Sequence, residues 1–173
     1  MFKKTFFVLC PSYHGATLLS TMLNSHPEIS SLGDTYPSNQ FDQVCGCGNK
    51  VSQCDFWKNI KLEVTASKFS DCSGLLPRYP LDSGSGLNQL FHSRFAKLWA
   101  SPENFRRFFS ENELGDFKSD YARFNRAAYA NISDPGHVFI DGVKSIARVH
   151  ALEAAGFQID GIIHLKRSSF DYV

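Results

Sequence analysis

The sequence predicts an α/β fold with a mostly parallel sheet, and three observations lead to this prediction. Short apolar runs that suit buried strands lie near residues 4–10, 28–32, 137–141 and 161–166. Segments with apolar residues at helical spacing lie between these runs. Glycine and proline separate the two kinds of segment. Strands that alternate with helices form parallel sheets whose strands are joined by right-handed crossovers.

The first strand, a turn and the first helix follow one another directly at the N-terminus. Residues 4–10 form the apolar run, and Pro11 and Gly15 mark the turn. The stretch ATLLSTMLNS comes next and places four apolar residues on one helical face, at Leu18, Leu19, Met22 and Leu23. His26-Pro27 ends this helix. We therefore expect a strand, a glycine turn and a helix in that order.

The segment at about 35–134 is expected to be an insertion between strands, first loop-rich and then helical. Residues 35–90 are rich in Ser, Gly, Pro, Asn and Cys. Apolar residues then recur at helical spacing, in stripes at Phe91, Phe95, Leu98 and Trp99, at Phe105, Phe108 and Phe109, and at Tyr121, Phe124 and Ala128. This pattern favours packing in the core over a binding role. We expect these helices to form a lid.

The last third of the chain returns to the alternating pattern. The run HVFID predicts a strand, Ser145 to Ala155 predict a helix, and Gly156 suits its C-terminal cap. The run IDGIIHLKR predicts a final strand, and no helix to cover it follows in the sequence. An open parallel sheet needs both faces covered. We therefore expect residues 1–173 to be a single domain that is incomplete at its C-terminal end.

Composition limits the classes of partner. The 18 Lys and Arg nearly balance the 17 Asp and Glu, which speaks against a nucleic-acid partner. No stretch approaches the roughly 20 apolar residues of a membrane span. The odd number of cysteines, five, favours a reducing compartment and hence a cytoplasmic location. The oligomeric state does not follow from the sequence.

Four spaced motifs carry a resemblance to a known family. They are SYHGATLL at 12–19 with HPEI and then Gly33-Asp34 downstream, CGCGNKVSQCDFW at 45–57, FIDGVKSIARVHAL at 139–152, and IIHLKR at 162–167. In this order they resemble the sulfotransferases that use 3′-phosphoadenosine 5′-phosphosulfate, above all bacterial and tyrosylprotein-type members. The resemblance implies a three-layer P-loop fold with the strand order 2-3-1-4.

The resemblance also implies a reaction. A sulfuryl group would pass from 3′-phosphoadenosine 5′-phosphosulfate, as co-substrate, to a hydroxyl or amine. The acceptor could be a small molecule, a saccharide or a protein. We expect no metal cofactor.

By the same resemblance, the loop around the 5′-phosphosulfate would consist of Tyr13, His14, Gly15, Ala16, Thr17 and Leu18. Three of these depart from the family pattern. Tyr13 stands in place of Lys or Arg, His14 in place of Ser, and Ala16 where Thr is common. Loss of one such charge typically lowers the rate about 10²- to 10³-fold. His14 either donates in its place when protonated or only hydrogen-bonds within the turn, and both interpretations stay open.

Three further residues have candidate roles by resemblance. Asp34 would be the general base, although it is one methylene shorter than the family's Glu; alternatively, Gly33-Asp34 is an ordinary turn. Lys144 would lend the charge that Tyr13 lacks, or is an exposed lysine at the start of a helix. Arg167 would pair with the 3′-phosphate, or is a solvated residue at the end of a strand. The candidate catalytic residues are thus Asp34, His14 and Lys144.

Two alternatives remain open. Cys45, Cys47 and Cys54 could bind zinc with Cys72 as fourth ligand, although their spacing is not that of a two-residue knuckle; a disulfide is also open, and free thiols are favoured over both. The altered loop is also compatible with a degenerate, non-catalytic module that binds a nucleotide or a partner. A nucleotide kinase is disfavoured because no glycine-lysine-serine/threonine loop is present.

Overall fold

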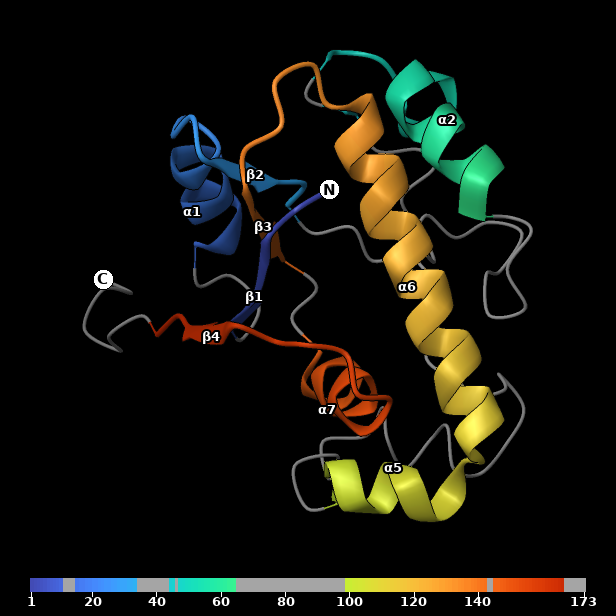
Figure 1. Ribbon diagram of the computed structural model, residues 1–173. Coiled ribbons are helices and arrows are strands. Elements are labelled where there is room, and N and C mark those ends of the chain that lie inside the picture. Colours follow the sequence, from blue (N-terminus) through green and yellow to red (C-terminus); the bar gives the residue numbers. More distant parts are fainter. Residues whose placement is uncertain (11–14, 34–43, 46, 65–98, 143–144, 167–173) are drawn as a thin grey trace. The chain divides into compact units, whose positions relative to one another are not determined.

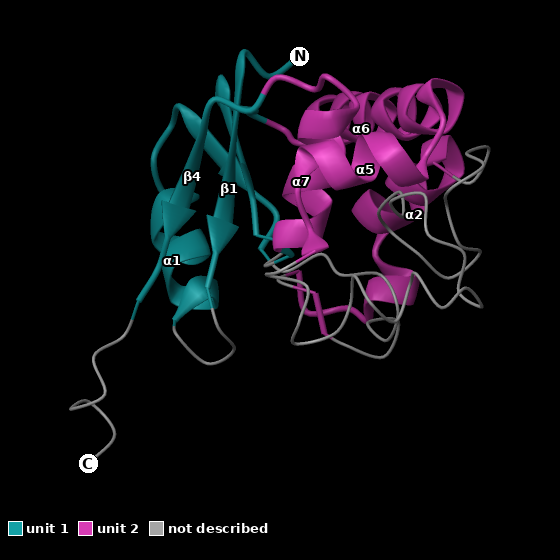
Figure 2. Ribbon diagram, turned by 90° about the horizontal axis from the view of Figure 1, so that it is seen from below, with its two compact units in different colours: residues 1–35, 134–145, 159–173 teal, residues 36–133, 146–158 magenta. Residues whose placement is uncertain are grey.

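A computed structural model of the protein describes residues 1–10, 15–33, 44–45, 47–64, 99–142 and 145–166. The chain divides into two compact units (Figure 2). The sheet unit comprises residues 1–35, 134–145 and 159–173. The helical unit comprises residues 36–133 and 146–158.

The sheet unit contains four parallel strands in the order β2-β3-β1-β4 (Figure 1). The strands are β1 (Lys4–Leu9), β2 (Ile29–Ser31), β3 (Val138–Asp141) and β4 (Gly161–His164). The predicted α/β class with a mostly parallel sheet is confirmed, as is the strand order 2-3-1-4. The architecture is consistent with a three-layer α/β fold.

Buried aromatic and aliphatic side chains form the core of the sheet unit. Phe7 and Val8 on β1 and Phe139 and Ile140 on β3 are all almost fully buried. Phe2 stacks on Phe139 with 4.8 Å between the ring centroids. Full burial of one such side chain stabilises the fold by about 1.5–3 kcal/mol. The apolar runs identified in the sequence therefore supply this core.

Two glycines allow close approaches between segments of the sheet unit. A Cβ atom at Gly136 would lie 2.2 Å from the carbonyl carbon of Glu28. The Gly136 N–H donates to Ser30 Oγ at 3.0 Å, so this approach is held by a hydrogen bond. A Cβ atom at Gly161 would lie 2.8 Å from the ring of Phe6 on the neighbouring strand. A larger residue at Gly136 would force the backbone at Glu28 to shift, whereas one at Gly161 would displace the Phe6 ring.

Helix α1 (Ala16–Leu23) lies beside β2 in the sheet unit (Figure 1). The helix predicted after the glycine turn is therefore confirmed. None of its residues is fully buried, and Leu18 and Met22 are 66% and 63% exposed. Asn24, just after the helix, accepts a hydrogen bond from the Ser31 N–H through its Oδ1 atom at 3.0 Å. Polar contacts of this kind help to hold the helix on the sheet.

The helical unit contains a 3-10 turn, η2 (Val51–Gln53), and four helices among its described residues. They are α2 (Asp55–Val64), α5 (Pro102–Phe108), α6 (Glu111–Asn131) and α7 (Ile146–Ala154). Helix α6 begins with a capping box in which Ser110 and Glu113 bond each other's backbone N–H groups. The predicted helix at Ser145 to Ala155 is confirmed as α7.

The core of the helical unit consists mainly of aromatic residues. Phe105, Tyr121 and Phe124 have no exposed surface, so the predicted packing role of these stripes is confirmed. The prediction is wrong for Phe108 and Trp99, which are 50% and 51% exposed, and Phe91, Phe95 and Leu98 lie outside the described residues. The guanidinium of the buried Arg148 lies over the Tyr121 ring, 5.2 Å from its centroid.

The end of α7 forms a Schellman motif. Gly156 adopts a left-handed conformation with φ 71°, as predicted for a cap. The Phe157 N–H donates to Leu152 O at 2.8 Å, and the Gly156 N–H donates to Glu153 O at 3.0 Å. Phe157 then packs edge-on against Tyr121, with 5.0 Å between the ring centroids.

The predicted domain organisation stays a prediction, as does the role of residues 35–134 as a lid. The helical unit includes 146–158 as well as most of that predicted insertion. Within the part of the chain that the structure describes, no helix has the length and apolar character needed to cross a bilayer.

Candidate functional site

The candidate site lies at the start of α1, which follows the inner strand β1. Gly15 is the N-terminal cap residue and has φ 84° and ψ 18°. Its carbonyl accepts the first hydrogen bond of the helix from the Leu19 N–H at 2.9 Å. A Cβ atom at Gly15 would meet nothing within 4 Å. Glycine is therefore favoured here by the left-handed backbone and not by lack of space.

The first turn of α1 presents backbone N–H groups that the helix itself cannot satisfy. They belong to Ala16, Thr17 and Leu18. No side chain in the described part of the chain caps this end, and the first turn contains no acidic residue. The positive end of the helix dipole acts at the same point. A phosphate or sulfate group suits this combination of donors and charge.

The sheet topology puts this turn at a place where α/β proteins bind ligands. Strands β1 and β3 are neighbours, but the chain leaves β1 for β2 at one edge of the sheet and leaves β3 for β4 at the other. Ligands of open α/β sheets bind outside the carboxyl ends of strands at such a point. The start of α1 is thus well placed for an anion.

Asp141 is a candidate residue that the sequence analysis did not select. It ends β3 in register with Phe7 of β1, and it is 2% exposed. The sequence carries a signal for it, because an apolar strand, Val138 to Ile140, ends directly in an acidic residue. The sequence does not show that Asp141 ends a strand next to β1; this follows from the pairing of β3 with β1.

The structure describes only part of the predicted site. Gly15, Ala16, Thr17 and Leu18 form the cap and the first turn of α1, and their contact with a phosphosulfate stays a prediction. The side chains of Thr17 and Leu18 are exposed, and that of Ala16 is half-buried. The remaining predicted site residues lie outside the described residues; they are Tyr13, His14, Asp34, Lys144 and Arg167. Their roles stay predictions.

A second group of reactive side chains lies in the helical unit. The Sγ atoms of Cys45, Cys47 and Cys54 all lie within 4.8 Å of one another. Hydrogen bonding to the backbone N–H of Asn49, together with the neighbouring thiols, lowers the pKa of Cys47. Burial raises the pKa of the Cys54 thiol. Thiolates are the form in which cysteine binds metals and reacts.

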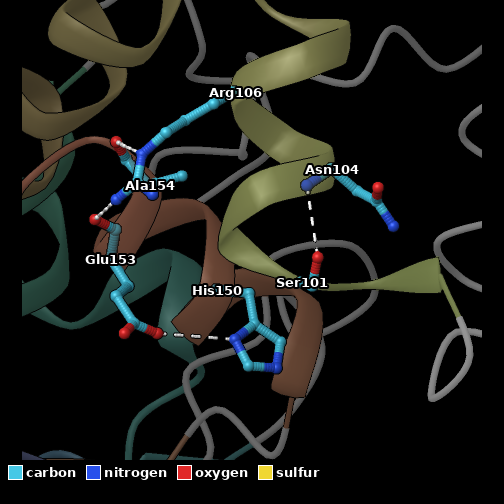
Figure 3. Close-up of polar contacts among 6 residues, drawn as sticks. All are labelled: Ser101, Asn104, Arg106, His150, Glu153 and Ala154. Atoms are coloured by element: carbon cyan, nitrogen blue, oxygen red, sulfur yellow. Dashed lines mark hydrogen bonds and ion pairs between the residues drawn. The ribbon is translucent and has the colours of Figure 1, made fainter.

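A third group, between α5 and α7, has a structural role (Figure 3). The Arg106 guanidinium reaches the last carbonyl groups of α7 and donates to Ala154 O at 3.4 Å and to Glu153 O at 3.5 Å. On α7 itself, His150 Nδ1 lies 3.5 Å from a carboxylate oxygen of Glu153. Arg106 thus supplies a donor to Ala154 O, one of the carbonyls that a helix leaves free at its C-terminal end, and a second donor to Glu153 O, which already accepts from the Gly156 N–H.

No family model, curated protein or solved structure matches this chain. The assignment of the site therefore depends on the geometry of the turn and on the residues around it. The sulfotransferase resemblance stays a prediction.

Proposed function

We propose that this chain binds 3′-phosphoadenosine 5′-phosphosulfate at the start of α1 and transfers its sulfuryl group to a hydroxyl or amine. The proposal depends mainly on one observation. Gly15 turns the chain from β1 into α1 and leaves the N–H groups of Ala16 to Leu18 at a helix end that no described side chain caps. This is the geometry that binds phosphate groups in nucleotide-binding α/β proteins. The sequence motifs add the identity of the nucleotide.

In the proposed reaction, the backbone donors hold the 5′-phosphosulfate while the acceptor oxygen attacks its sulfur. A bond forms between the acceptor oxygen and sulfur, and the bond between sulfur and the bridging phosphate oxygen breaks. Asp34 takes the proton of the acceptor hydroxyl, and adenosine 3′,5′-bisphosphate leaves with the bridging oxygen. The helix end and a protonated His14 or Lys144 would stabilise the charge on that leaving oxygen. Arg167 would hold the 3′-phosphate.

A second function is favoured by two residues of the predicted phosphosulfate loop. Ala16 offers no hydroxyl to the phosphosulfate, and Tyr13 brings no positive charge. A turn that keeps its backbone donors and lacks these side chains would bind the nucleotide without turnover. A non-catalytic nucleotide-binding module is therefore the alternative.

Calorimetric titration of the 173-residue chain with adenosine 3′,5′-bisphosphate tests the binding step. We expect saturable binding, and weaker binding of adenosine 5′-monophosphate, which lacks the 3′-phosphate. Absence of binding at millimolar nucleotide, by calorimetry and by equilibrium dialysis, would exclude both functions. An assay of radiolabelled sulfate transfer from the donor to a panel of phenols, saccharides and amines then distinguishes the sulfotransferase from the non-catalytic module. Binding without transfer to any acceptor would favour the non-catalytic module.

A further inference from the structure

Three of the five cysteines meet at one place in the helical unit, although two segments contribute them. Cys45 and Cys47 come from a turn, and Cys54 comes from the start of α2. All three Sγ atoms lie within 4.8 Å of one another. Cys54 is buried, Cys45 is half-buried and Cys47 is exposed. The cluster is therefore anchored in the core and open to solvent on one side.

Backbone hydrogen bonds hold the turn that carries the first two cysteines. Val44 and Lys50 form an antiparallel bridge, and the Cys45 N–H donates to Asn49 O at 2.8 Å. The Gly48 N–H donates to Cys45 O at 2.8 Å, and Gly48 has φ 86°. A left-handed glycine allows the chain to reverse within so few residues. The turn thus keeps Cys45 and Cys47 close without help from their side chains.

A second set of backbone bonds brings Cys54 back to this turn. The Cys54 N–H donates to Lys50 O at 3.0 Å, so the 3-10 turn η2 starts where the bridge ends. The Cys54 carbonyl accepts from the Lys58 N–H at 2.9 Å and so begins α2. The positions of all three thiols are therefore set by the backbone, which lowers the cost of assembling a site around an ion.

The spacing of the thiols suits a tetrahedral metal ion. Zinc binds thiolate sulfur at about 2.3 Å, which places the sulfurs of a tetrahedral site about 3.8 Å apart. Thiols that lie within 4.8 Å of one another reach this spacing by small side-chain rotations. A disulfide would use two of these thiols and leave the third unpaired, whereas a metal ion uses all three. Thiolate ligands favour zinc over magnesium and calcium, which prefer oxygen.

We propose that Cys45, Cys47 and Cys54 bind one Zn²⁺ ion as thiolates, with a solvent-derived ligand in the fourth position. Each thiol releases its proton to the buffer on binding, and no oxidation or reduction takes place. The exposed side of the cluster, at Cys47, leaves room for the fourth ligand. The ion would tie the turn at residues 44–50 to the start of α2. This proposal differs from the expectation of no metal cofactor, and it is independent of the proposed sulfuryl transfer.

The test uses a Cys10→Ser/Cys72→Ser background, in which the cluster contains the only three cysteines, beside a Cys10→Ser protein that shows whether Cys72 contributes to zinc binding. The reduced protein is titrated with Zn²⁺, and with Co²⁺ as a spectroscopic probe. We expect one ion per chain by elemental analysis and a thiolate-to-cobalt charge-transfer band that zinc abolishes. Mg²⁺ should not compete. In the same background, Cys45→Ser, Cys47→Ser and Cys54→Ser should each weaken zinc binding by at least about tenfold, while Ser52→Ala, an exposed change in the same segment, should not.

Cys47→Ser is the decisive variant because its side chain is exposed and its loss should leave the fold intact. Zinc should raise the Tm of the background protein and should raise that of the Cys47→Ser variant much less. Equal zinc binding by the background protein and by a variant that lacks all three thiols would overturn the proposal. So would the absence of a charge-transfer band with Co²⁺ in reduced protein. A disulfide between two of the three cysteines that persists in reductant would also contradict it.

Discussion

The Oγ atoms of Ser20 on α1 and Ser31 on β2 lie 2.7 Å apart and share a hydrogen bond. Ser31 Oγ also donates to Ile140 O on β3 at 3.3 Å, so Ser20 is the donor in the first bond. Two hydroxyl groups thus connect the helix at the candidate site with two neighbouring strands. Because the helix buries no residue fully, these polar contacts matter for its position.

Replacement of Ser31 by Ala should lower the free energy of unfolding by about 1–3 kcal/mol, because both hydroxyl bonds are lost and Ser20 loses its acceptor. Ser20→Ala should cost about 1 kcal/mol. The loss of unfolding free energy in the double variant should be smaller than the sum of the losses in the two single variants, since both single variants remove the same Ser20–Ser31 hydrogen bond. Urea denaturation measures all three. Strict additivity would show that the two serines do not interact.

Gly15→Ala and Gly115→Ala should change stability in opposite directions. Neither Cβ atom would meet another atom within 4 Å, so steric contact does not decide whether the substitution stabilises or destabilises the fold. Alanine at Gly15 must adopt φ 84°, which costs about 1–2 kcal/mol. Gly115 lies inside α6, where alanine should stabilise by about 0.5–1 kcal/mol.

These two glycine variants also test the proposed function. Adenosine 3′,5′-bisphosphate should bind more weakly to Gly15→Ala and with unchanged affinity to Gly115→Ala. Calorimetry and thermal unfolding on the same preparations measure affinity and stability together. A Gly15→Ala protein as stable as the parent would contradict the left-handed conformation.

Tyr13→Arg should increase the rate of sulfuryl transfer, by up to about 10²-fold, if Tyr13 occupies the position of the family's cation. The restored charge would stabilise the leaving phosphate oxygen. Initial rates with a fixed acceptor measure the effect, and Tyr13→Phe serves as an uncharged control. A fast parent protein that the change slows would show that the loop is misaligned. His14→Ala, assayed in parallel, should lose most activity only if His14 supplies the charge.

Glu103→Gln should remove part of the acid sensitivity of the fold. Its own backbone N–H, the Ser101 hydroxyl and the charges of Arg106 and His150 lower the pKa of Glu103. In the unfolded chain the pKa of a glutamate is about 4.3, and at pH values above it a lower pKa in the folded state stabilises the fold. This stabilisation is lost as the pH falls through the pKa that Glu103 has in the folded state. The parent should therefore exceed the variant in Tm at pH 6, and the difference should shrink below about pH 4.

Because the Glu103 carboxylate is fully exposed, salt should also reduce this difference. Glu111→Gln, at the exposed start of α6, provides a matched control. A Tm difference between the parent and Glu103→Gln that stays constant from pH 6 to pH 3 would contradict the lowered pKa.

Much of the fold was predictable because its signals are local. The strands expected near 4–10 and 137–141 are observed at Lys4–Leu9 and Val138–Asp141. The helix after Gly15 and the glycine cap at Gly156 were also expected from residue type alone. Periodicity and glycine act over a few residues, so one sequence suffices to locate them. The strand order followed from the family resemblance and not from these signals.

The candidate site was predictable to a smaller extent. The helix start from Gly15 to Leu18 depends on neighbouring residues, and the sequence placed it correctly. The position of Asp141 in register with Phe7 was not predicted, because it depends on β3 lying next to β1, a contact between segments more than a hundred residues apart. Roles for Tyr13, Asp34 and Arg167 came from resemblance alone, and the Tyr13→Arg variant tests the first of them.

The sequence by itself determined the fold class, the position of the strands and the glycine turn before α1, because backbone preferences and hydrophobic periodicity decide them locally. Tertiary structure alone decided which distant groups meet. It put β3 next to β1, so that Asp141 lies in register with Phe7. It also placed Gly136 against the Glu28 carbonyl. Such contacts depend on how whole segments pack, and no short stretch of sequence encodes that packing.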